Sequence, residues 1–350
     1  MEKWSIQATG KLPITSFSFT MSTGIISISA LIHNEAMIST ALFFIGLASL
    51  LSIFFLYTLK IVGDTMAFKL EFHDKRRFFG FFTISAAVDV ISTRLMITNL
   101  HPFDYILFVI SVGFLVLFSV VLLHALFQGK LQFSRDTVTS DWLNVSVALE
   151  ASAISISVYY QNVSPPSEII YMFTFALVLA GLFSYASVNL IEGINLIKQV
   201  EKMEFNGMFF INMGAGAILS LASLELLMVP VPFPSLLTQQ ILNFLFAAGG
   251  IYATLWLPVV LYRYFRTLSN VRAIRYRVSQ WAIIFPLGMY SVTTHYLSRS
   301  FQIYGVFNLI SYAAFVAALS AWALECIIAA RHIIGEWNSA KEGDEADNPS

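Results

Sequence analysis

Long apolar runs constrain this chain more than any other feature of its sequence. Ten stretches of about 20 residues are long enough to cross the hydrocarbon core of a bilayer as helices. They cover residues 13–33, 37–60, 78–98, 103–127, 142–161, 168–191, 208–229, 236–261, 280–298 and 303–330. Only 12% of the residues are charged, which is about half the share of a soluble domain. The sequence therefore predicts an all-α polytopic membrane protein with one transmembrane domain, residues 1–335, and a disordered cytoplasmic tail, residues 336–350.

Basic residues gather in every second loop. Of the 20 lysines and arginines, 18 lie in the two terminal segments and in the loops after the second, fourth, sixth and eighth runs. The turns after the first, third, fifth and seventh runs hold none. Cytoplasmic loops carry the excess of lysine and arginine in membrane proteins. Both termini are therefore predicted to be cytoplasmic, and we expect a multi-pass protein of the plasma membrane.

The runs also repeat in pairs. The odd-numbered runs begin near residues 13, 78, 142, 208 and 280, so that each unit is a helix outward, a short turn, a helix back and a basic loop. Such a period favours five helical hairpins in a quasi-fivefold ring around a central pore, although any alternating bundle has regular spacing. The odd runs hold 23 serines and threonines and the even runs hold 14. Small and hydroxyl side chains favour close helix packing, so the odd helices are predicted to form the inner ring.

Two segments resemble a known family. They are "FSFTMSTGIISISALI" in the first run and "WAIIFPLGMYSVTTHYL" in the ninth. Both are similar to the tellurite-resistance/dicarboxylate transporter family, which includes fungal malate and sulfite transporters, bacterial tellurite-resistance proteins and the slow-type anion channels of plant guard cells. The resemblance implies ten helices in five hairpins, a central anion pore lined by the odd helices, and a homotrimer. It also implies that Phe285 and Pro286 form the gate.

Pro286 has a physical interpretation of its own. A proline cannot donate a backbone hydrogen bond to the carbonyl of Ala282, so a bend is expected there. The half-helix that begins at the bend would present a weakly positive end, which favours an anion. Phe285 could then plug a narrow apolar path, with Gly288 and Val292 on the same helical stripe. The alternative is a proline kink that only improves packing.

Several further residues are assigned to the substrate pathway. Asp89 and Glu150 lie in the middle of the third and fifth runs, and ionisable groups inside a membrane are candidates for function. A protonatable Glu150 would suit proton-coupled uptake of an anion, and a buried packing role is equally open. The hydroxyl-rich first run adds Ser22, Thr23 and Gly24.

Two arginines lie near the outer ends of the third and ninth runs. Arg94 and Arg299 could draw anions to the outer mouth of a pore. Snorkelling, or pairing with Glu225 or Asp104, explains each of them equally well.

These features together favour transport of small anions. The best single substrate class is C4-dicarboxylates such as malate, moved through a central pore gated by Phe285 and driven by protons. The alternatives are a passive channel for chloride or nitrate, a sulfite or tellurite exporter and, less favoured, a membrane-embedded enzyme. The single cysteine and the lack of phosphate-loop, dinucleotide or HExxH motifs predict no catalytic residue, metal or cofactor, and no nucleic-acid partner. The expected partners are inorganic or carboxylate anions, membrane lipid and further copies of the chain.

Overall fold

The computed structural model describes residues 12–98, 103–131, 138–162, 167–199, 210–231, 234–268, 276, 278–302 and 304–347. Within these residues the chain is helical and has no strand, which confirms the all-α prediction. The long helices are α2 (Phe17–Ile32), α3 (Ala36–Gly63), α5 (Phe82–Ile97), α6 (Phe103–Phe127), α7 (Leu143–Asn162), α8 (Glu168–Gln199), α9 (Ile211–Leu227), α10 (Leu236–Leu268), α11 (Trp281–Ser300) and α12 (Tyr304–Asp347). The shorter elements are α4 (Thr65–His73) and the 3-10 turns η1 (Ile14–Ser16), η2 (Arg77–Phe81), η3 (Ser140–Trp142) and η6 (Val278–Gln280).

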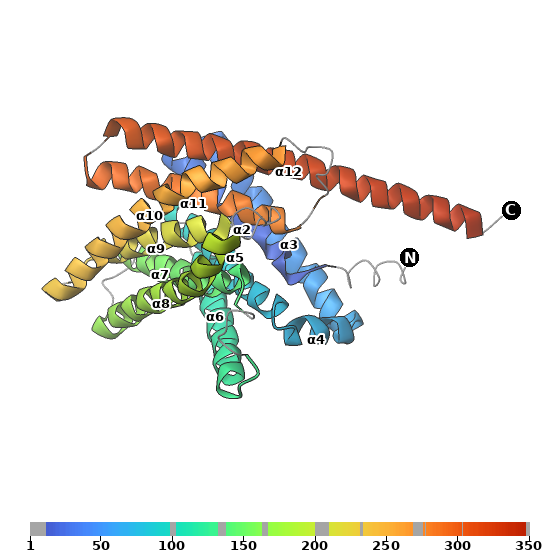
Figure 1. The fold of residues 1–350 in the computed structure, drawn as a ribbon, viewed down its shortest axis with the longest axis horizontal. Coiled ribbons are helices and arrows are strands. Elements are labelled where there is room, and N and C mark those ends of the chain that lie inside the picture. The colour runs from blue at the N-terminus through green and yellow to red at the C-terminus, as the bar shows by residue number, and fades with distance from the viewer. Residues whose placement is uncertain are drawn as a thin grey trace.

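Consecutive long helices pack as hairpins. The pairs are α2 with α3, α5 with α6, α7 with α8, α9 with α10, and α11 with α12 (Figure 1). The first helix of each hairpin also packs against the first helices of two other hairpins, in the closed order α2, α5, α7, α9, α11 and back to α2. Among the described residues, the chain thus forms an inner ring of five helices, each backed by its own outer partner.

Burial separates the two sets of helices. In the most apolar stretch of α5, 94% of the residues are buried, whereas the figure is 17% in its partner α6. The outer helix is nevertheless the more apolar of the two. This reversal is expected in a membrane, because lipid is as apolar as a protein core and only the protein interior offers partners to polar groups.

Serine hydroxyls join the two helices of the hairpins. Ser27 and Ser39 each donate to the other's backbone carbonyl, at 2.7 and 2.8 Å. The same exchange joins Ser85 to Ser111 at 3.2 and 3.1 Å, and Ser291 to Ser311 at 2.8 and 2.7 Å. In the other two hairpins, the described residues show one such bond each, from Ser146 to the Gly181 carbonyl at 2.9 Å and from Ser220 to the Phe246 carbonyl at 2.6 Å. A related polar contact therefore recurs in all five hairpins.

Eight helices in the described part of the chain are long and apolar enough to cross a membrane. These are the ten long helices without α9 and α11, and the η1, η2 and η3 turns extend three of them. Helix α9 has 17 residues, and α11 has 20 residues but carries hydroxyl, histidine and arginine side chains. Both belong to the inner ring, where protein rather than lipid surrounds them. Crossing of the bilayer by all ten therefore stays a prediction.

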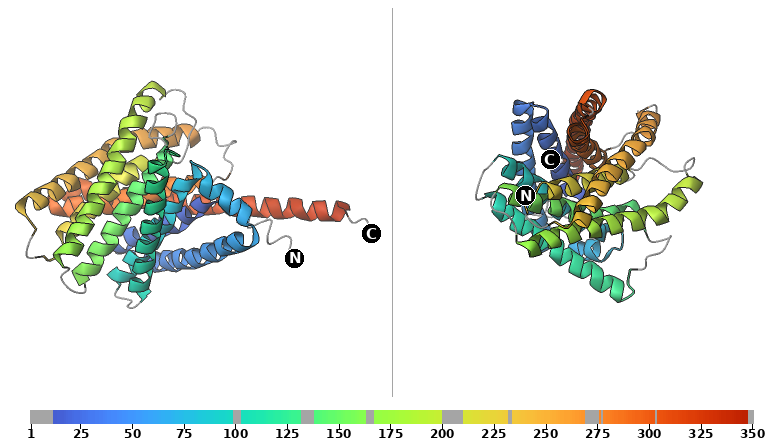
Figure 2. Two further views of the ribbon diagram at one scale, coloured as in Figure 1. Left: turned by 90° about the horizontal axis from the view of Figure 1, so that it is seen from below. Right: turned by 90° about the vertical axis from the view of Figure 1, so that its left-hand side faces the viewer.

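The C-terminal segment begins as part of the last helix. Helix α12 continues through Asp347 as one helix, and disorder of the tail 336–350 stays a prediction. Residues 336–347 include three glutamates, two alanines and one lysine, and the first proline after them is Pro349. Such residues favour helix even where polarity excludes them from a core. The C-terminal part of α12 projects beyond the other helices (Figure 2).

Candidate functional site

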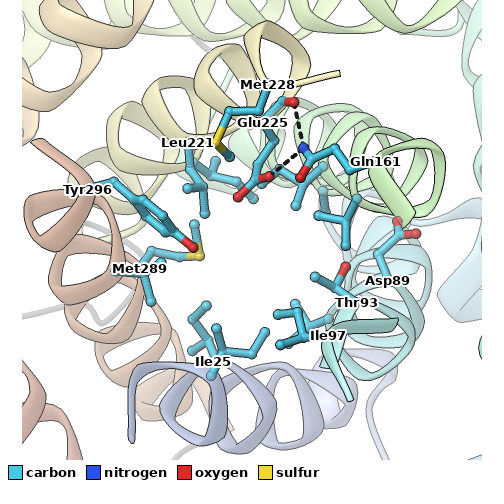
Figure 3. Close-up of a pocket in the computed structure, with 17 residues that line it drawn as sticks. Ile25, Asp89, Thr93, Ile97, Gln161, Leu221, Glu225, Met228, Met289 and Tyr296 are labelled. Carbon is cyan, nitrogen blue, oxygen red and sulfur yellow. Dashed lines mark hydrogen bonds between the residues drawn. The ribbon is translucent and has the colours of Figure 1, made fainter. Parts of the chain in front are cut away.

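A cavity lies on the axis of the inner ring. It has a volume of about 250 Å³ and is lined only by residues of α2, α5, α7, α9 and α11 and by Met228, which directly follows α9 (Figure 3). In each inner helix the lining begins near the middle and continues toward the C-terminal end. All five inner helices therefore run in the same direction, as the repeat of the sequence predicted.

The lining residues fall into layers that cross the ring. The first layer takes one residue from each helix: Ile25, Val90, Ala151, Ile218 and Met289. The second layer lies three residues further along each helix: Ile28, Thr93, Ile154, Leu221 and Val292. The third lies seven residues beyond the first in four helices: Ile97, Val158, Glu225 and Tyr296. Spacings of three and seven keep one face of a helix toward the axis, so the five helices share one rotation and one height.

The polar groups of the cavity are acids, amides and hydroxyls. Gln161 Nε2 donates to the backbone oxygen of Glu225 at 2.8 Å and to its Oε2 at 2.9 Å. Ser152 donates to Asp89 Oδ2 at 2.6 Å, while the buried Asp89 Oδ1 has no hydrogen-bond partner among the described residues. Among the described residues that line the cavity, none is a lysine, arginine or histidine.

The cavity ends at a layer of close packing. One helical turn before the first layer stand Met21, Ala86, Val147, Gly214 and Phe285. All five are buried and none lines the cavity. Phe285 is the largest of them and is 1% exposed. Since Phe285 lies four residues before Met289, its side chain continues the axis-facing stripe of α11, below the floor of the cavity.

A second closed layer follows on the far side of Phe285. Seven residues before the first layer stand Ser18, Thr83, Asn144, Ile211 and Ala282, all buried. Thr83 Oγ1 donates to the Gly80 carbonyl at 2.6 Å. The Asn144 side chain is 3% exposed, and its Nδ2 has no hydrogen-bond partner among the described residues. A buried N–H donor on the axis-facing stripe is suited to an anion or a water molecule.

A sequence profile of the voltage-dependent anion channel family matches residues 11–330. The chain belongs to that family. The match spans the inner ring and the outer helices up to residue 330 of α12, and it confirms the resemblance seen in the first and ninth apolar runs. Transporters and channels of this family move anions across membranes, so the chain is a multi-pass membrane protein of anion transport. No curated protein matches it.

In this member of the voltage-dependent anion channel family, two predicted pathway residues line the cavity, Asp89 and Val292. Phe285 lies on the same axis, and Pro286 packs sideways. Helix α11 is continuous from Trp281 to Ser300 with Pro286 inside it, so the structure does not separate a half-helix that begins at Pro286. A Cβ added at Gly214 would lie 2.9 Å from Pro286 Cγ, which makes the proline part of the α9–α11 contact.

The other predicted pathway residues are used in helix packing. Ser22 donates to the Trp281 carbonyl at 2.9 Å, and Thr23 accepts from Trp322 Nε1 of α12 at 2.9 Å. A Cβ at Gly24 would lie 2.7 Å from Val90 Cγ1. None of the three lines the cavity.

Helix α11 departs from its predicted orientation at Gly288. A Cβ at Gly288 would lie 2.8 Å from Ile25 Cγ2, so Gly288 faces α2. Met289 instead lines the cavity. The predicted stripe is therefore displaced by one residue at this point.

Glu150 faces the outer ring. Its Oε1 accepts from Ser146 at 3.0 Å, and a Cβ at Gly181 of α8 would lie 2.7 Å from its Cγ. The Glu150 Oε2 is buried and has no partner among the described residues. The structure therefore brings Asp89, not Glu150, to the central cavity.

The two arginines differ in position. Arg94 is buried between α2 and α3, where it donates to Ser27 Oγ at 3.2 Å and to Ser39 Oγ at 2.9 Å and lies 5.5 Å from the centroid of the Phe43 ring. It does not line the cavity, which differs from the expectation for the outer mouth. Arg299 is exposed at the end of α11, where attraction of anions stays a prediction.

Nothing in the sequence alone pointed to Gln161, Met289 or Asn144. A periodic signal was nevertheless present, because lining residues lie three apart in every inner helix and seven apart in four of them. To use this spacing, one must know which residue of each helix is the first to face the cavity, and only the structure shows that.

Proposed function

We propose that the chain moves small anions along the axis of the inner ring, with Phe285 as the gate. One observation carries this proposal: the first two lining layers take one residue from each of the five helices in the same register, and the layer with Phe285, one helical turn away on the same stripe, is fully buried. The residues opposite Phe285 are smaller, down to Gly214. The volume of the Phe285 side chain therefore decides whether this layer is open.

The favoured cargo is a C4-dicarboxylate such as malate. A cavity of about 250 Å³ has room for roughly eight water molecules, and hence for a small carboxylate with part of its hydration. The family resemblance supports the same class. Passive conduction of chloride or nitrate is the second candidate, because the first two layers are largely apolar and offer no cation to hold an anion. Export of sulfite or tellurite is the third.

Proton coupling follows from the charges of the cavity. An anion there meets the carboxyl groups of Asp89 and Glu225 without a neighbouring cation in the lining. An anion and an ionised carboxylate inside one small cavity repel each other strongly, because the dielectric constant there is low. Protonation of a carboxyl removes the repulsion, so a proton and an anion would enter together. Asp89 is the better proton carrier, because one of its oxygens lacks a partner in the described structure.

The surroundings of the ring complete the proposal. Large apolar side chains are exposed along α3, α6, α8, α10 and α12, which suits lipid and contacts between copies in a homotrimer. The charge pattern supports cytoplasmic termini in the plasma membrane. A cysteine at position 35 should then react with an impermeant thiol reagent only from outside, in a Cys326→Ser background. Reaction only from the cytoplasmic side would reverse the orientation.

Transport is tested in liposomes that contain the purified protein. A panel of malate, chloride, nitrate and sulfite is offered with and without an inward proton gradient. Saturable malate uptake that follows the gradient supports the carrier. Flux proportional to the driving force and independent of pH favours the channel, and the absence of flux for every anion contradicts the proposal.

A further inference from the structure

Helix α4 connects the outer helix α3 to the entry of the second inner helix. It begins at Thr65, after the single residue Asp64, and the Asp64 side chain caps it by accepting from Ala67 N at 2.9 Å. In Figure 1 it turns away from the end of α3. Because α3 carries exposed apolar residues almost to its end, as at Val62, α4 starts where the chain leaves the bilayer.

The inner face of α4 is fixed to the start of the first inner helix. Glu71 is 2% exposed, and Lys60 Nζ donates to its Oε2 at 2.7 Å. Tyr57 donates to the same oxygen at 2.8 Å, and the Ile14 backbone N–H donates to Oε1 at 2.7 Å. Lys60 also donates to the Leu12 carbonyl at 2.6 Å. One carboxylate thus links α3, α4 and the chain just before α2.

Aromatic contacts link α4 to the start of the second inner helix. The Phe72 ring lies 5.5 Å from Phe78 and 5.1 Å from Phe81, between ring centroids. Phe68 lies 6.1 Å from Phe81. Phe78 and Phe81 belong to η2, which leads directly into α5. A displacement of α4 would therefore move the first turns of two adjacent helices of the ring.

The outer face of α4 is both apolar and basic. Met66 is 65% exposed and Leu70 is 63% exposed, and the two are one helical turn apart. Lys69 lies between them, and Lys75, Arg76 and Arg77 follow, all exposed. An apolar stripe flanked by cations is the pattern of a helix that lies in the interface of a bilayer with anionic lipid.

The acids of this segment cancel only part of its charge: Arg77 Nε lies 3.8 Å from Asp74 Oδ2, and both side chains remain exposed. Asp64 caps α4, and Asp74 accepts from the backbone N–H groups of Arg76 and Arg77 at 2.8 and 3.1 Å. Partial burial raises the pKa of Asp74, but the backbone N–H groups and the positive charges of Arg77 and Arg76 together lower it by more, so its pKa lies below its ordinary value. Asp74 therefore stays ionised and shapes the basic turn, and the exposed cations of the segment still outnumber its exposed acids.

We propose that α4 is a lipid-binding helix, which inserts Met66 and Leu70 between acyl chains and binds anionic headgroups through Lys69, Lys75, Arg76 and Arg77. Through Glu71, Phe68 and Phe72, the bound lipid holds the nearby ends of α2 and α5. The anionic lipid content of that leaflet thereby sets the rate of transport. The insertion of α4 is independent of the proposed function, and only the effect on rate rests on it.

Insertion is measured with an environment-sensitive fluorophore on Met66→Cys in a Cys326→Ser background. Vesicles of phosphatidylcholine alone are compared with mixed phosphatidylcholine–phosphatidylglycerol vesicles. We expect emission at shorter wavelength in the mixed vesicles, and a loss of this shift when the four cations are changed to glutamine or when salt screens them. The same label at Val62→Cys should report lipid in both, and Lys130→Gln should change nothing. A Met66 label that reports water, or the same environment in both vesicles, overturns the proposal.

The effect on rate is measured as anion flux in the same two kinds of vesicle. We expect faster or slower flux in mixed vesicles for the parent and no difference for Glu71→Gln, whose Met66 label still shifts. If Glu71→Gln does not yield a homogeneous protein, Tyr57→Phe removes one donor to the same carboxylate and is measured instead. Equal flux of the parent in both lipids contradicts the coupling. Absence of flux everywhere with an intact fluorescence shift contradicts the proposed function and leaves lipid binding in place.

Discussion

The two halves of the central path are built from the same five helices and the same axis-facing stripe, yet one is hollow and the other is filled. Beyond Phe285, isoleucine, valine, threonine and tyrosine side chains leave about 250 Å³ between the helices. At Phe285 and on its far side, the residues of the stripe are buried and do not line the cavity. Side-chain volume therefore closes the path while the helices keep their register, so a single substitution can test the closure.

The largest effect is expected from Phe285→Ala. Removal of the ring leaves only smaller side chains in its layer, and flux should rise about tenfold or more, which a barrier lower by about 1.4 kcal/mol would produce. The measurement is anion flux into proteoliposomes. Phe17→Ala is the matched control, because Phe17 is fully buried and packs against Phe54 of the outer helix. It should lose about 3–5 kcal/mol of stability without a gain in flux. Equal flux in parent and Phe285→Ala would exclude the gate.

The next effect concerns Asn144, on the far side of the gate. Asn144→Asp replaces an N–H donor by a negative charge on the axis, and anion flux should fall at least about tenfold, since like charges at short range in protein repel by more than about 1.4 kcal/mol. Asn144→Ala removes the donor without adding charge and should have a smaller effect. Both are measured in the Phe285→Ala background, where flux is highest. An unchanged flux in Asn144→Asp would place Asn144 away from the path.

Asp89 tests the charge of the hollow half. Protonation removes its negative charge, so uptake by the parent should rise as the outside pH falls. Asp89→Asn cannot ionise, and its uptake should stay near the acidic level at every pH. The initial rate of malate uptake across a pH series is the measurement. Glu150→Gln is the control that should keep the parent profile, because Glu150 faces α8. A flat profile in Glu150→Gln and a normal one in Asp89→Asn would reverse the assignment.

The smallest effect tests how tightly the filled half is packed. Gly214→Val places atoms within 3 Å of Pro286, where a Cβ alone lies 2.9 Å from Cγ. We expect a loss of about 1–3 kcal/mol from overpacking, seen as a lower temperature of thermal unfolding. Gly113→Ala on α6 meets nothing within 4 Å and should be neutral or slightly stabilising. Equal melting of Gly214→Val and the parent would mean that this layer can expand.

The sequence was sufficient for the architecture but not for the site. Apolar runs and the alternation of basic loops predicted the hairpins, and hydroxyl content separated inner from outer helices. The rotation of each inner helix could not be predicted, because a helix buried on all sides has no polar face to show its direction. Glu150 and Asn144 illustrate this, since both are polar residues of α7. They lie six residues apart and hence on different faces of the helix, and only the structural register assigns Asn144 to the axis-facing stripe.

Because the rotation of each helix is unknown from sequence, the roles of the glycines could not be predicted either. Gly24, Gly214 and Gly288 each receive a side chain from a neighbouring helix, and sequence cannot tell such a contact from an opening for substrate. Phe285 was selected as the gate through family resemblance, which carries over a position from related proteins and does not depend on knowing the rotation of the helix. Arg94 was misplaced because its partners, Ser27 and Ser39, lie in other helices and are neutral.

The serine exchanges within the hairpins bear on how the protein enters the membrane during synthesis. Helices α9 and α11 are the least suited of the ten to leave the translocation machinery for lipid on their own, by length or by polarity. Each is followed within a few residues by an apolar partner, α10 or α12, whose backbone accepts its serine hydroxyls. Hairpins, rather than single helices, are therefore the natural unit of insertion. The ring closes last, when α11 meets α2 and Ser291 reaches Ser29, 262 positions earlier in the chain.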